Sequence, residues 1–150
     1  MTAAEGNLET LRRWYAHTRD AYKTGTDLEA ALTLIPEIFD PQVEFSPWLA
    51  REVEHRTYHG HEGLRRFFEE LRDMLGAVRY APEEYEPLSD DLIVVFTRLE
   101  GVGRGSAVPV GQDLGLVYEF QDGLVIRLTA FGSHEEALNA AKEMQGAQAQ

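Results

Sequence analysis

A charged pair two residues apart is the clearest candidate for chemistry in the sequence. Arg98 and Glu100 flank Leu99 in a stretch rich in apolar and β-branched residues, and side chains two positions apart on a strand point to the same face. Beside an arginine, Glu100 could titrate and exchange a proton with a bound substrate. The same alternation of charge is also typical of an exposed cross-strand ladder. Residues 93–96 are all apolar, so the pattern does not decide which side of this strand faces inward.

Tyr15 is the second candidate, and it has two interpretations. It is either a hydroxyl donor in a pocket or a core tyrosine whose hydroxyl reaches the surface. Tyr118 likewise either lines a pocket or supports a dimer face. The sequence leaves both alternatives open.

The sequence gives little support for a metal or cofactor site. His55, His59 and His61 lie close together, but their spacing does not match the helical pairs that bind zinc, which favours solvated loop residues. The chain has no cysteine, which excludes thiolate metal sites and a cysteine nucleophile. The glycine-rich segment 101–105 lies between two predicted strands and lacks the helix N-terminus that a phosphate loop uses. We therefore expect neither a metal nor a cofactor.

The composition limits the classes of partner. The chain has 150 residues, with 14 Lys and Arg against 26 Asp and Glu, and a formal net charge of −12. This charge repels phosphate backbones and anionic lipids, so we expect no nucleic-acid and no membrane partner. Residues 92–96 form the longest apolar run, far too short to span a bilayer, and the N-terminus does not resemble a secretory signal. We expect a cytoplasmic protein with one domain over residues 1–150 and an ordered core at about 7–142.

The elements that must position these residues follow from periodicity and turn signals. Helical spacing predicts a first helix capped by Asn7 and ending near Gly25, and a second that begins near Thr26 and breaks at Pro36. The remaining predicted elements are a strand at 43–46, a loop at 47–60, a helix at 61–74, strands at 78–85, 92–101, 106–120 and 124–131, and a last helix capped by Ser133. This order predicts an α+β fold with a curved antiparallel sheet and helices packed on its concave face.

Four stretches together resemble a known superfamily. They are the first helix with Trp14 and Tyr15, the turn and strand at 39–45, the segment at 58–68 and the hairpin at 118–125. In order and spacing the chain resembles the SnoaL-like, or nuclear transport factor 2-like, superfamily, which includes ketosteroid isomerase-like proteins. The resemblance covers about residues 7–142 and implies a cone-shaped α+β fold that encloses a pocket. It does not specify a reaction, because the superfamily contains isomerases, cyclases, dehydratases, epoxide hydrolases and non-enzymes.

The resemblance implies roles that can be compared residue by residue. In steroid isomerase-like members a tyrosine on the first helix donates a hydrogen bond, and Tyr15 stands at that position. Their catalytic base corresponds to about Phe45 and their protonated aspartate to a position near Leu116. Neither residue can exchange a proton, which disfavours that reaction.

The residues that two other reactions of the superfamily use are present in this sequence in part. Epoxide hydrolase-like members use an arginine and an acid two residues apart, which Arg98 and Glu100 resemble, but their second acid falls near Thr129. SnoaL-type cyclases use one aspartate on the later strands, and Asp113 is the only aspartate near the middle of that region. Cyclase chemistry therefore stays open.

These observations predict a small-molecule-binding protein with an apolar pocket for a hydrophobic, ring-containing metabolite. It would act as a cofactor-free acid/base enzyme of the hydrolase, isomerase or cyclase type if it turns its ligand over. The catalytic candidates are Arg98, Glu100 and Tyr15. The candidate substrate-binding residues are aromatic: Phe45, Trp48, Tyr58, Phe67, Phe96, Tyr118 and Phe131. The alternative is a non-catalytic dimeric binding or scaffold module, since apolar residues on both sides of a strand are compatible with a homodimer.

Overall fold

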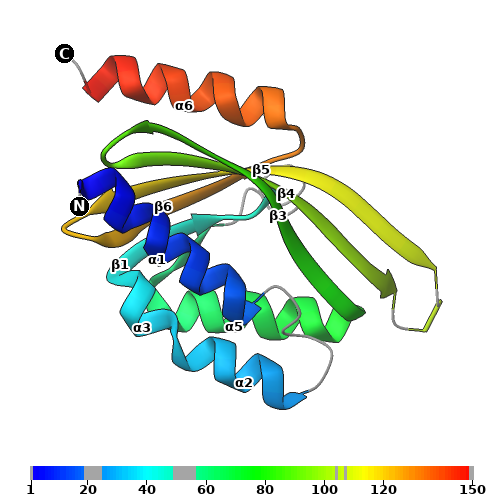
Figure 1. The fold of residues 1–150 in the computed structure, drawn as a ribbon. Helices are drawn as coiled ribbons and strands as arrows, with labels where there is room; N and C mark the ends of the chain where they lie inside the picture. Colours follow the sequence, from blue (N-terminus) through cyan, green and yellow to red (C-terminus); the bar gives the residue numbers. More distant parts are fainter. Residues whose placement is uncertain (1, 19–24, 49–56, 104, 107, 149–150) are drawn as a thin grey trace.

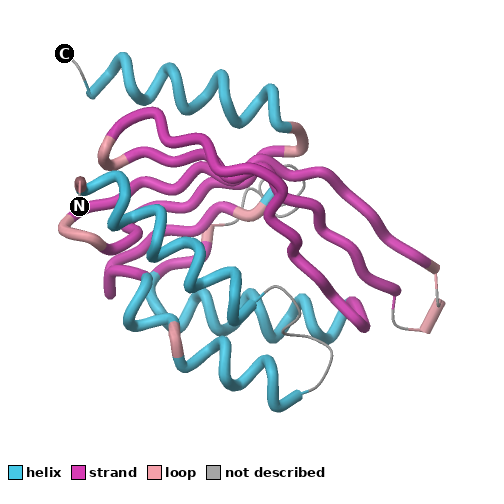
Figure 2. Tube along the Cα trace, viewed as in Figure 1, coloured by secondary structure: helices cyan, strands magenta, loops and turns pink. Residues whose placement is uncertain are grey.

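The computed structural model describes residues 2–18, 25–48, 57–103, 105–106 and 108–148. Figures 1 and 2 show a sheet with helices on both of its faces. The elements follow in the order α1 (Ala3–Thr18), α2 (Gly25–Thr33), α3 (Ile35–Ile38), β1 (Phe39–Ser46), β2 (Tyr58–His59), α5 (Gly60–Met74), β3 (Leu75–Ser89), β4 (Leu92–Gly103), β5 (Pro109–Gln121), β6 (Leu124–Phe131) and α6 (His134–Gln148).

The six strands form one sheet in the order β2-β1-β6-β5-β4-β3. Every neighbouring pair is antiparallel except β1 and β6, which run parallel. The α+β prediction is confirmed, but the sheet is mixed rather than fully antiparallel. β1 and β6 are far apart in the sequence, so no tight turn forces them to run in opposite directions.

Most of the helices cover one face, which we call the inner face. α1, α2, α3 and α5 lie together on this side in Figure 1. The larger core cluster lies between these helices and the sheet and contains Leu11, Trp14 and Tyr15 of α1, Ile38 at the end of α3, and Leu64 of α5. This arrangement matches the predicted packing of helices against the sheet.

α6 differs from the prediction because it lies against the opposite, outer face (Figure 1). Ala137 and Ala141 of α6 are fully buried and belong to a second core cluster with Val94 and Phe96 of β4 and Val117 of β5. Small residues allow the close approach: a Cβ at Gly115 would lie 2.9 Å from the carbonyl oxygen of Ser133 and would overlap Ala137.

Helix ends agree with the sequence signals in part. The Glu136 N–H donates to Ser133 Oγ at 3.1 Å, which confirms Ser133 as the cap of α6. The prediction that Asn7 caps the first helix is wrong. The helix begins at Ala3, the Glu5 N–H donates to Thr2 Oγ1 at 3.1 Å, and buried Asn7 donates to the carbonyl oxygen of Asp90 at 2.7 Å.

Two further predicted boundaries are the helix break at Pro36 and the end of the loop at 47–60. The predicted break at Pro36 is confirmed, since α2 ends at Thr33 and Pro36 occupies the first turn of α3, where its missing N–H costs nothing. The predicted loop at 47–60 is wrong at its end, because Tyr58 and His59 form β2. Residues 49–56 of that loop lie outside the described residues, as do residues 19–24, through which the first helix was predicted to continue to near Gly25. α2 begins at Gly25.

Candidate functional site

Side-chain alternation along β4 decides which residues share the inner face. Ile93 and Val95 belong to the inner core, whereas Val94 and Phe96 belong to the cluster beneath α6. Leu99 also packs on the inner core, so Arg98 and Glu100 point to the outer side. Both faces of this strand are covered by helices, which explains why residues 93–96 are apolar at every position.

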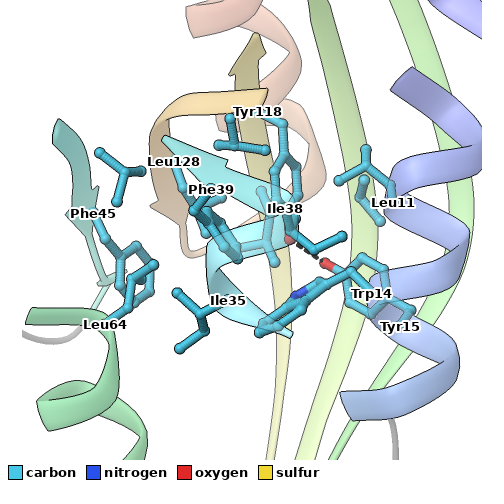
Figure 3. Packing of buried hydrophobic residues seen from close by; sticks show 14 of the residues in the cluster. Leu11, Trp14, Tyr15, Ile35, Ile38, Phe39, Phe45, Leu64, Tyr118 and Leu128 are labelled. Atoms are coloured by element: carbon cyan, nitrogen blue, oxygen red, sulfur yellow. Dashed lines mark hydrogen bonds between the residues drawn. The ribbon is translucent and has the colours of Figure 1, made fainter. Parts of the chain in front are cut away.

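Two tyrosines meet on the inner face. Tyr15 on α1 and Tyr118 on β5 place their hydroxyl oxygens 2.7 Å apart, one hydroxyl donating to the other. Figure 3 shows the two side chains pointing toward each other across the core. Their exposed fractions are 3% and 1%. We call these two residues the tyrosine pair.

Two more tyrosines from β3 lie beside the pair. The Tyr85 ring packs edge-on against Tyr15, with centroids 6.2 Å apart, and Tyr80 also packs on the inner core. Tyr80 pairs with Leu99 and Tyr85 with Val95, and a bulge between Pro82 and Glu84 shifts the register between them. Without that bulge, residues five positions apart would face opposite sides of the sheet.

Burial controls the ionisation of these tyrosines. It raises the pKa of Tyr15, Tyr118 and Tyr80 above the ordinary value, because the phenolate form would lose its hydration. Burial also raises the pKa of Tyr85, while the nearby Arg12 guanidinium lowers it in part. All four hydroxyls therefore stay protonated near neutral pH and each keeps a proton that it can donate in a hydrogen bond.

The number of hydroxyl protons shows how many hydrogen bonds the tyrosine pair can donate. Two hydroxyls carry two protons, and the bond between them uses only one. Within the described part of the chain, neither hydroxyl makes another hydrogen bond. One O–H is therefore left without a protein acceptor in a buried position, where an unmade hydrogen bond costs roughly 1–3 kcal/mol.

Aromatic rings extend from the pair across the inner face. The Trp14 ring lies 5.0 Å from Phe39 and 5.9 Å from Phe68. Phe68 in turn contacts Phe67 at 5.3 Å, and Phe67 contacts Phe45 at 4.7 Å. These contacts form one continuous aromatic cluster in the inner core, which also contains the tyrosine pair.

A second polar group lies at the far end of these rings. The Tyr58 ring is 5.5 Å from that of Phe67, and its hydroxyl donates to Glu70 Oε2 of α5 at 2.7 Å. Glu70 lies three residues after Phe67, so both occupy the same side of the helix. The carboxylate is partly buried.

Arg98 and Glu100 do not join the tyrosine pair. Arg98 Nη1 lies 3.1 Å from Asp113 Oδ1, and Arg98 Nε lies 3.7 Å from Glu100 Oε1. The three side chains are 40%, 57% and 52% exposed in the order Arg98, Asp113 and Glu100. They form a solvent-exposed ladder on the outer side of β4 and β5, which is the second of the two interpretations given above.

The predicted aromatic residues divide between the two faces. Phe45, Trp48, Tyr58, Phe67 and Tyr118 all belong to the inner core or pack against it. Phe96 and Phe131 lie on the outer side with α6, where the Phe96 ring stacks on His134 at 4.4 Å. The outer apolar residues that suggested a sheet-face dimer are thus covered by the chain's own helix.

An open groove lies along α1. It has a volume of about 400 Å³ and is lined by Glu5, Leu8, Glu9 and Arg12 of α1. The Arg12 guanidinium lies 5.8 Å from the centre of the Tyr85 ring, which in turn contacts Tyr15. Arg12 therefore lines the groove and also contacts one of the tyrosines beside the pair.

The histidines take separate positions. His61 Nε2 is 2.7 Å from the carbonyl oxygen of Phe39, His59 is exposed on β2, and His55 lies outside the described residues. Among the residues that the structure describes, no group of three His, Asp or Glu side chains could hold a metal ion. No helix in the same part of the chain is long and apolar enough to cross a membrane.

Sequence reasoning missed Tyr80, Tyr85 and Glu70 as members of this region. Tyr85 lies in an acidic stretch that is typical of a solvated surface, and the bulge that turns it inward leaves no clear pattern. Glu70 could have been found from its spacing to Phe67 on the predicted helix.

Comparison with known proteins supports the fold. No protein-family model and no curated protein sequence matches the chain. Among solved structures, a candidate SnoaL-like polyketide cyclase from Jannaschia sp. CCS1 is 18% identical, with a TM-score of 0.72 and coverage of 94% of each chain. TerC, crystallised with polyporic acid, is 25% identical, with a TM-score of 0.66 and coverage of 92% of this chain and 98% of that one.

A nuclear transport factor 2-like protein of unknown function from Burkholderia pseudomallei K96243 is 17% identical, with a TM-score of 0.67 and coverage of 91% of this chain and 97% of that one. A hypothetical protein from Catenulispora acidiphila is described as having a ketosteroid isomerase-like fold. The chain therefore has the fold of the nuclear transport factor 2-like superfamily, to which the SnoaL-like and ketosteroid isomerase-like proteins belong.

Proposed function

We propose that the protein binds a hydrophobic, ring-containing small molecule through a carbonyl oxygen that accepts a hydrogen bond from the tyrosine pair. The observation that carries this proposal is the buried 2.7 Å contact between Tyr15 and Tyr118, which leaves one O–H without an acceptor among the residues that the structure describes. A carbonyl oxygen satisfies this donor, and the rings of Trp14 and Phe39 belong to the same apolar core as the pair.

The pair also defines the chemistry that it could assist. A donor hydroxyl becomes a stronger donor when it accepts a hydrogen bond from a second hydroxyl. Such a donor stabilises negative charge that develops on a carbonyl oxygen, as in enolisation or a cyclisation through an enolate. Acid/base turnover of an isomerase or cyclase type would thus depend on the hydroxyl of the pair that does not donate to the other.

Two of the similar structures agree with this ligand class. TerC was crystallised with polyporic acid, and the protein from Jannaschia is described as a candidate polyketide cyclase. Arg98 and Glu100 are left out of the proposed site because their side chains lie on the outer side of the sheet.

A matched pair of ligands tests the proposal. 2-Tetralone and tetralin share a fused two-ring skeleton, and only the first has a carbonyl. We expect the ketone to bind several-fold to tenfold more tightly in a calorimetric titration, since a hydrogen bond contributes about 0.5–1.5 kcal/mol. This preference should fall to less than twofold in the double variant Tyr15→Phe/Tyr118→Phe.

The controls make the outcome decisive. Glu100→Gln removes a carboxylate on the outer side, so it should leave the preference for the ketone unchanged. Equal binding of both ligands by the unmodified protein, or a preference that survives the double substitution, would contradict the proposal.

A further inference from the structure

The tyrosine pair is closed to solvent in this structure. Tyr15 and Tyr118 are almost completely buried, at 3% and 1% exposed. A ligand can therefore reach their hydroxyls only when a side chain that covers them moves. We expect this side chain to be one that few polar contacts hold in place.

Tyr85 meets that condition better than the other ring that contacts Tyr15. In the described part of the chain, Tyr118 and Tyr85 have rings in contact with Tyr15, at 6.4 Å and 6.2 Å between centroids. Tyr118 is on β5 inside the sheet, whereas Tyr85 is half-buried on β3, at the edge. Among the described residues the Tyr85 hydroxyl makes no hydrogen bond, so rotation of this side chain breaks none.

The Tyr85 side chain also lies near the hydroxyls of the pair. Burial raises the pKa of Tyr15 and of Tyr118, and the interaction of each with Tyr85 raises it further. Such an interaction weakens with distance, so Tyr85 is close to both. When its ring rotates away from Tyr15, the place that it leaves is next to the O–H that the pair can donate.

Arg12 holds the Tyr85 ring in its present position. The guanidinium carbon lies 5.8 Å from the centre of the ring, within the distance at which an aromatic face attracts a cation. Arg12 also lines the open groove along α1, which has a volume of about 400 Å³. This volume is within the range of small-molecule sites.

From these contacts we propose that Tyr85 is a gate over the tyrosine pair. Its ring fills the place beside Tyr15 that a ring of the ligand takes, and the Arg12 guanidinium stabilises this closed position. The ligand binds when the Tyr85 ring rotates away. The inference rests on the proposed function, since the pair is the site that the gate covers, and it adds two residues that control entry.

The variant Arg12→Gln tests the gate through the kinetics of 2-tetralone binding to the full chain. Stopped-flow tryptophan fluorescence gives the association and dissociation rate constants. Loss of the cation destabilises the closed form, so the association rate constant and the affinity should rise together, by about two- to fivefold. The dissociation rate constant should stay the same, because Arg12 acts on the unliganded protein.

Two variants are matched controls for Arg12→Gln. Glu9→Gln removes the 3.0 Å ion pair between Arg12 and Glu9 but keeps the guanidinium, so it should not speed association. Arg13→Gln removes the neighbouring arginine, which pairs with Glu37 at 2.6 Å, and should leave both rate constants unchanged. Association that is no faster in Arg12→Gln, or equally fast in Glu9→Gln, overturns the gate.

The variant Tyr85→Ala removes the gate itself. We expect it to speed the association of 2-tetralone and of tetralin by a larger factor than Arg12→Gln does. The preference for the ketone should remain, since the tyrosine pair is intact. Slower or weaker binding of both ligands would show that the ring is a fixed wall of the site, which overturns the gate.

A probe at position 85 reports the movement without removing the ring. In protein with 3-fluorotyrosine at this position, saturation with 2-tetralone should shift the ¹⁹F signal toward that of the unfolded chain. A signal that stays unchanged at saturation overturns the gate.

Failure of the gate and failure of the proposed function give different results. If 2-tetralone and tetralin bind equally well, and both bind faster in Tyr85→Ala, the proposed function fails and the gate stands. If the ketone is preferred but neither Arg12→Gln nor Tyr85→Ala binds it faster, the gate alone is overturned. Absence of saturable binding in every variant contradicts both.

Discussion

The hydroxyl of Tyr15 on α1 lies 2.7 Å from that of Tyr118 on β5, and this contact links the first helix to an inner strand of the sheet. Both side chains are buried, and within the described ranges of the chain each hydroxyl has the other as its hydrogen-bond partner. The contact therefore contributes to stability, and under the proposed function it also supplies the proton that a ligand carbonyl accepts.

We expect each single substitution in the tyrosine pair to lower the free energy of unfolding by more than the loss of one exposed hydroxyl would. Tyr15→Phe or Tyr118→Phe leaves the remaining hydroxyl buried without its partner, at a cost of about 1–2 kcal/mol in the free energy of unfolding. The double variant removes both hydroxyls and should cost less than the sum of the two single variants. Urea denaturation of the four proteins measures this coupling, and strictly additive effects would argue against a hydrogen bond between the two residues.

The same variants should reveal the direction of the bond. If Tyr15 donates to Tyr118, then Tyr118 keeps the proton that reaches the ligand, and Tyr118→Phe weakens ketone binding more than Tyr15→Phe does. The reverse order of affinities for 2-tetralone would assign the outer proton to Tyr15. Equal binding by both single variants and the unmodified protein would show that neither hydroxyl contacts the ketone.

Alkaline pH should destabilise the protein through its buried tyrosines. Burial raises the pKa of Tyr15 and Tyr118 in the folded state above the unfolded value of about 10. The unfolded chain therefore loses these protons first, so the stabilisation is complete below pH 10 and is lost as the pH rises further. Each tyrosine contributes a slope of roughly 1.4 kcal/mol per pH unit above that point.

Unfolding free energies between pH 9 and pH 11.5 measure this effect. The double variant Tyr15→Phe/Tyr118→Phe should show a shallower decline, and the decline that remains includes the contribution of Tyr80, whose pKa is also raised by burial. Parallel curves for the unmodified and double-variant proteins would contradict the assignment.

Periodicity predicted the class of fold and most of the elements because each of them obeys local rules. The cap at Ser133, the break at Pro36 and the bounds of β6 depend on residues within a few positions of one another. Which side of β4 faces inward could not be predicted. Ile93 belongs to the inner core while Val94 belongs to the cluster beneath α6, so both sides of the strand are apolar for different reasons.

The candidate site was predicted only in part, because its contacts join distant segments. Tyr15 and Tyr118 were both identified from the sequence, but no local pattern links residues 103 positions apart. Arg98 and Glu100 have the spacing of a strand pair, and that spacing is the same on either side of the sheet. Only the packing of Leu99 and Val95 on the inner core assigns the charged pair to the outer side.

We expect α6 to pack this closely on β5 only when residue 115 has no side chain. A Cβ there would overlap Ala137 and lie 2.9 Å from the Ser133 carbonyl oxygen, so Gly115→Ala must displace the helix. We expect a loss of about 1–3 kcal/mol in the free energy of unfolding. Gly146→Ala on the same helix is the matched control: nothing lies within 4 Å of the added atom, and alanine favours a helix. Thermal melting compares the two, and equal melting temperatures would show that α6 does not pack tightly on β5.

Replacing Arg127 should lower the free energy of unfolding by more than is usual for a half-exposed arginine. Its Nη1 lies 3.4 Å from Glu119 Oε2, whose side chain is 11% exposed, and its Nε lies 3.4 Å from Glu44 Oε2, whose side chain is 44% exposed. Arg127→Met leaves the Glu119 carboxylate buried without a cation, which should cost about 1–3 kcal/mol. Glu44→Gln removes an exposed partner and should cost less than about 1 kcal/mol.

The double variant Arg127→Met/Glu119→Gln separates the charge from the packing of Arg127. If the uncompensated carboxylate causes the loss, then neutralising Glu119 should restore most of the stability that Arg127→Met removes, since a neutral amide is cheaper to bury than a carboxylate. Urea denaturation at pH 7 measures the recovery. If Glu119→Gln does not rescue Arg127→Met, the arginine stabilises the outer face through the packing of its aliphatic stem instead.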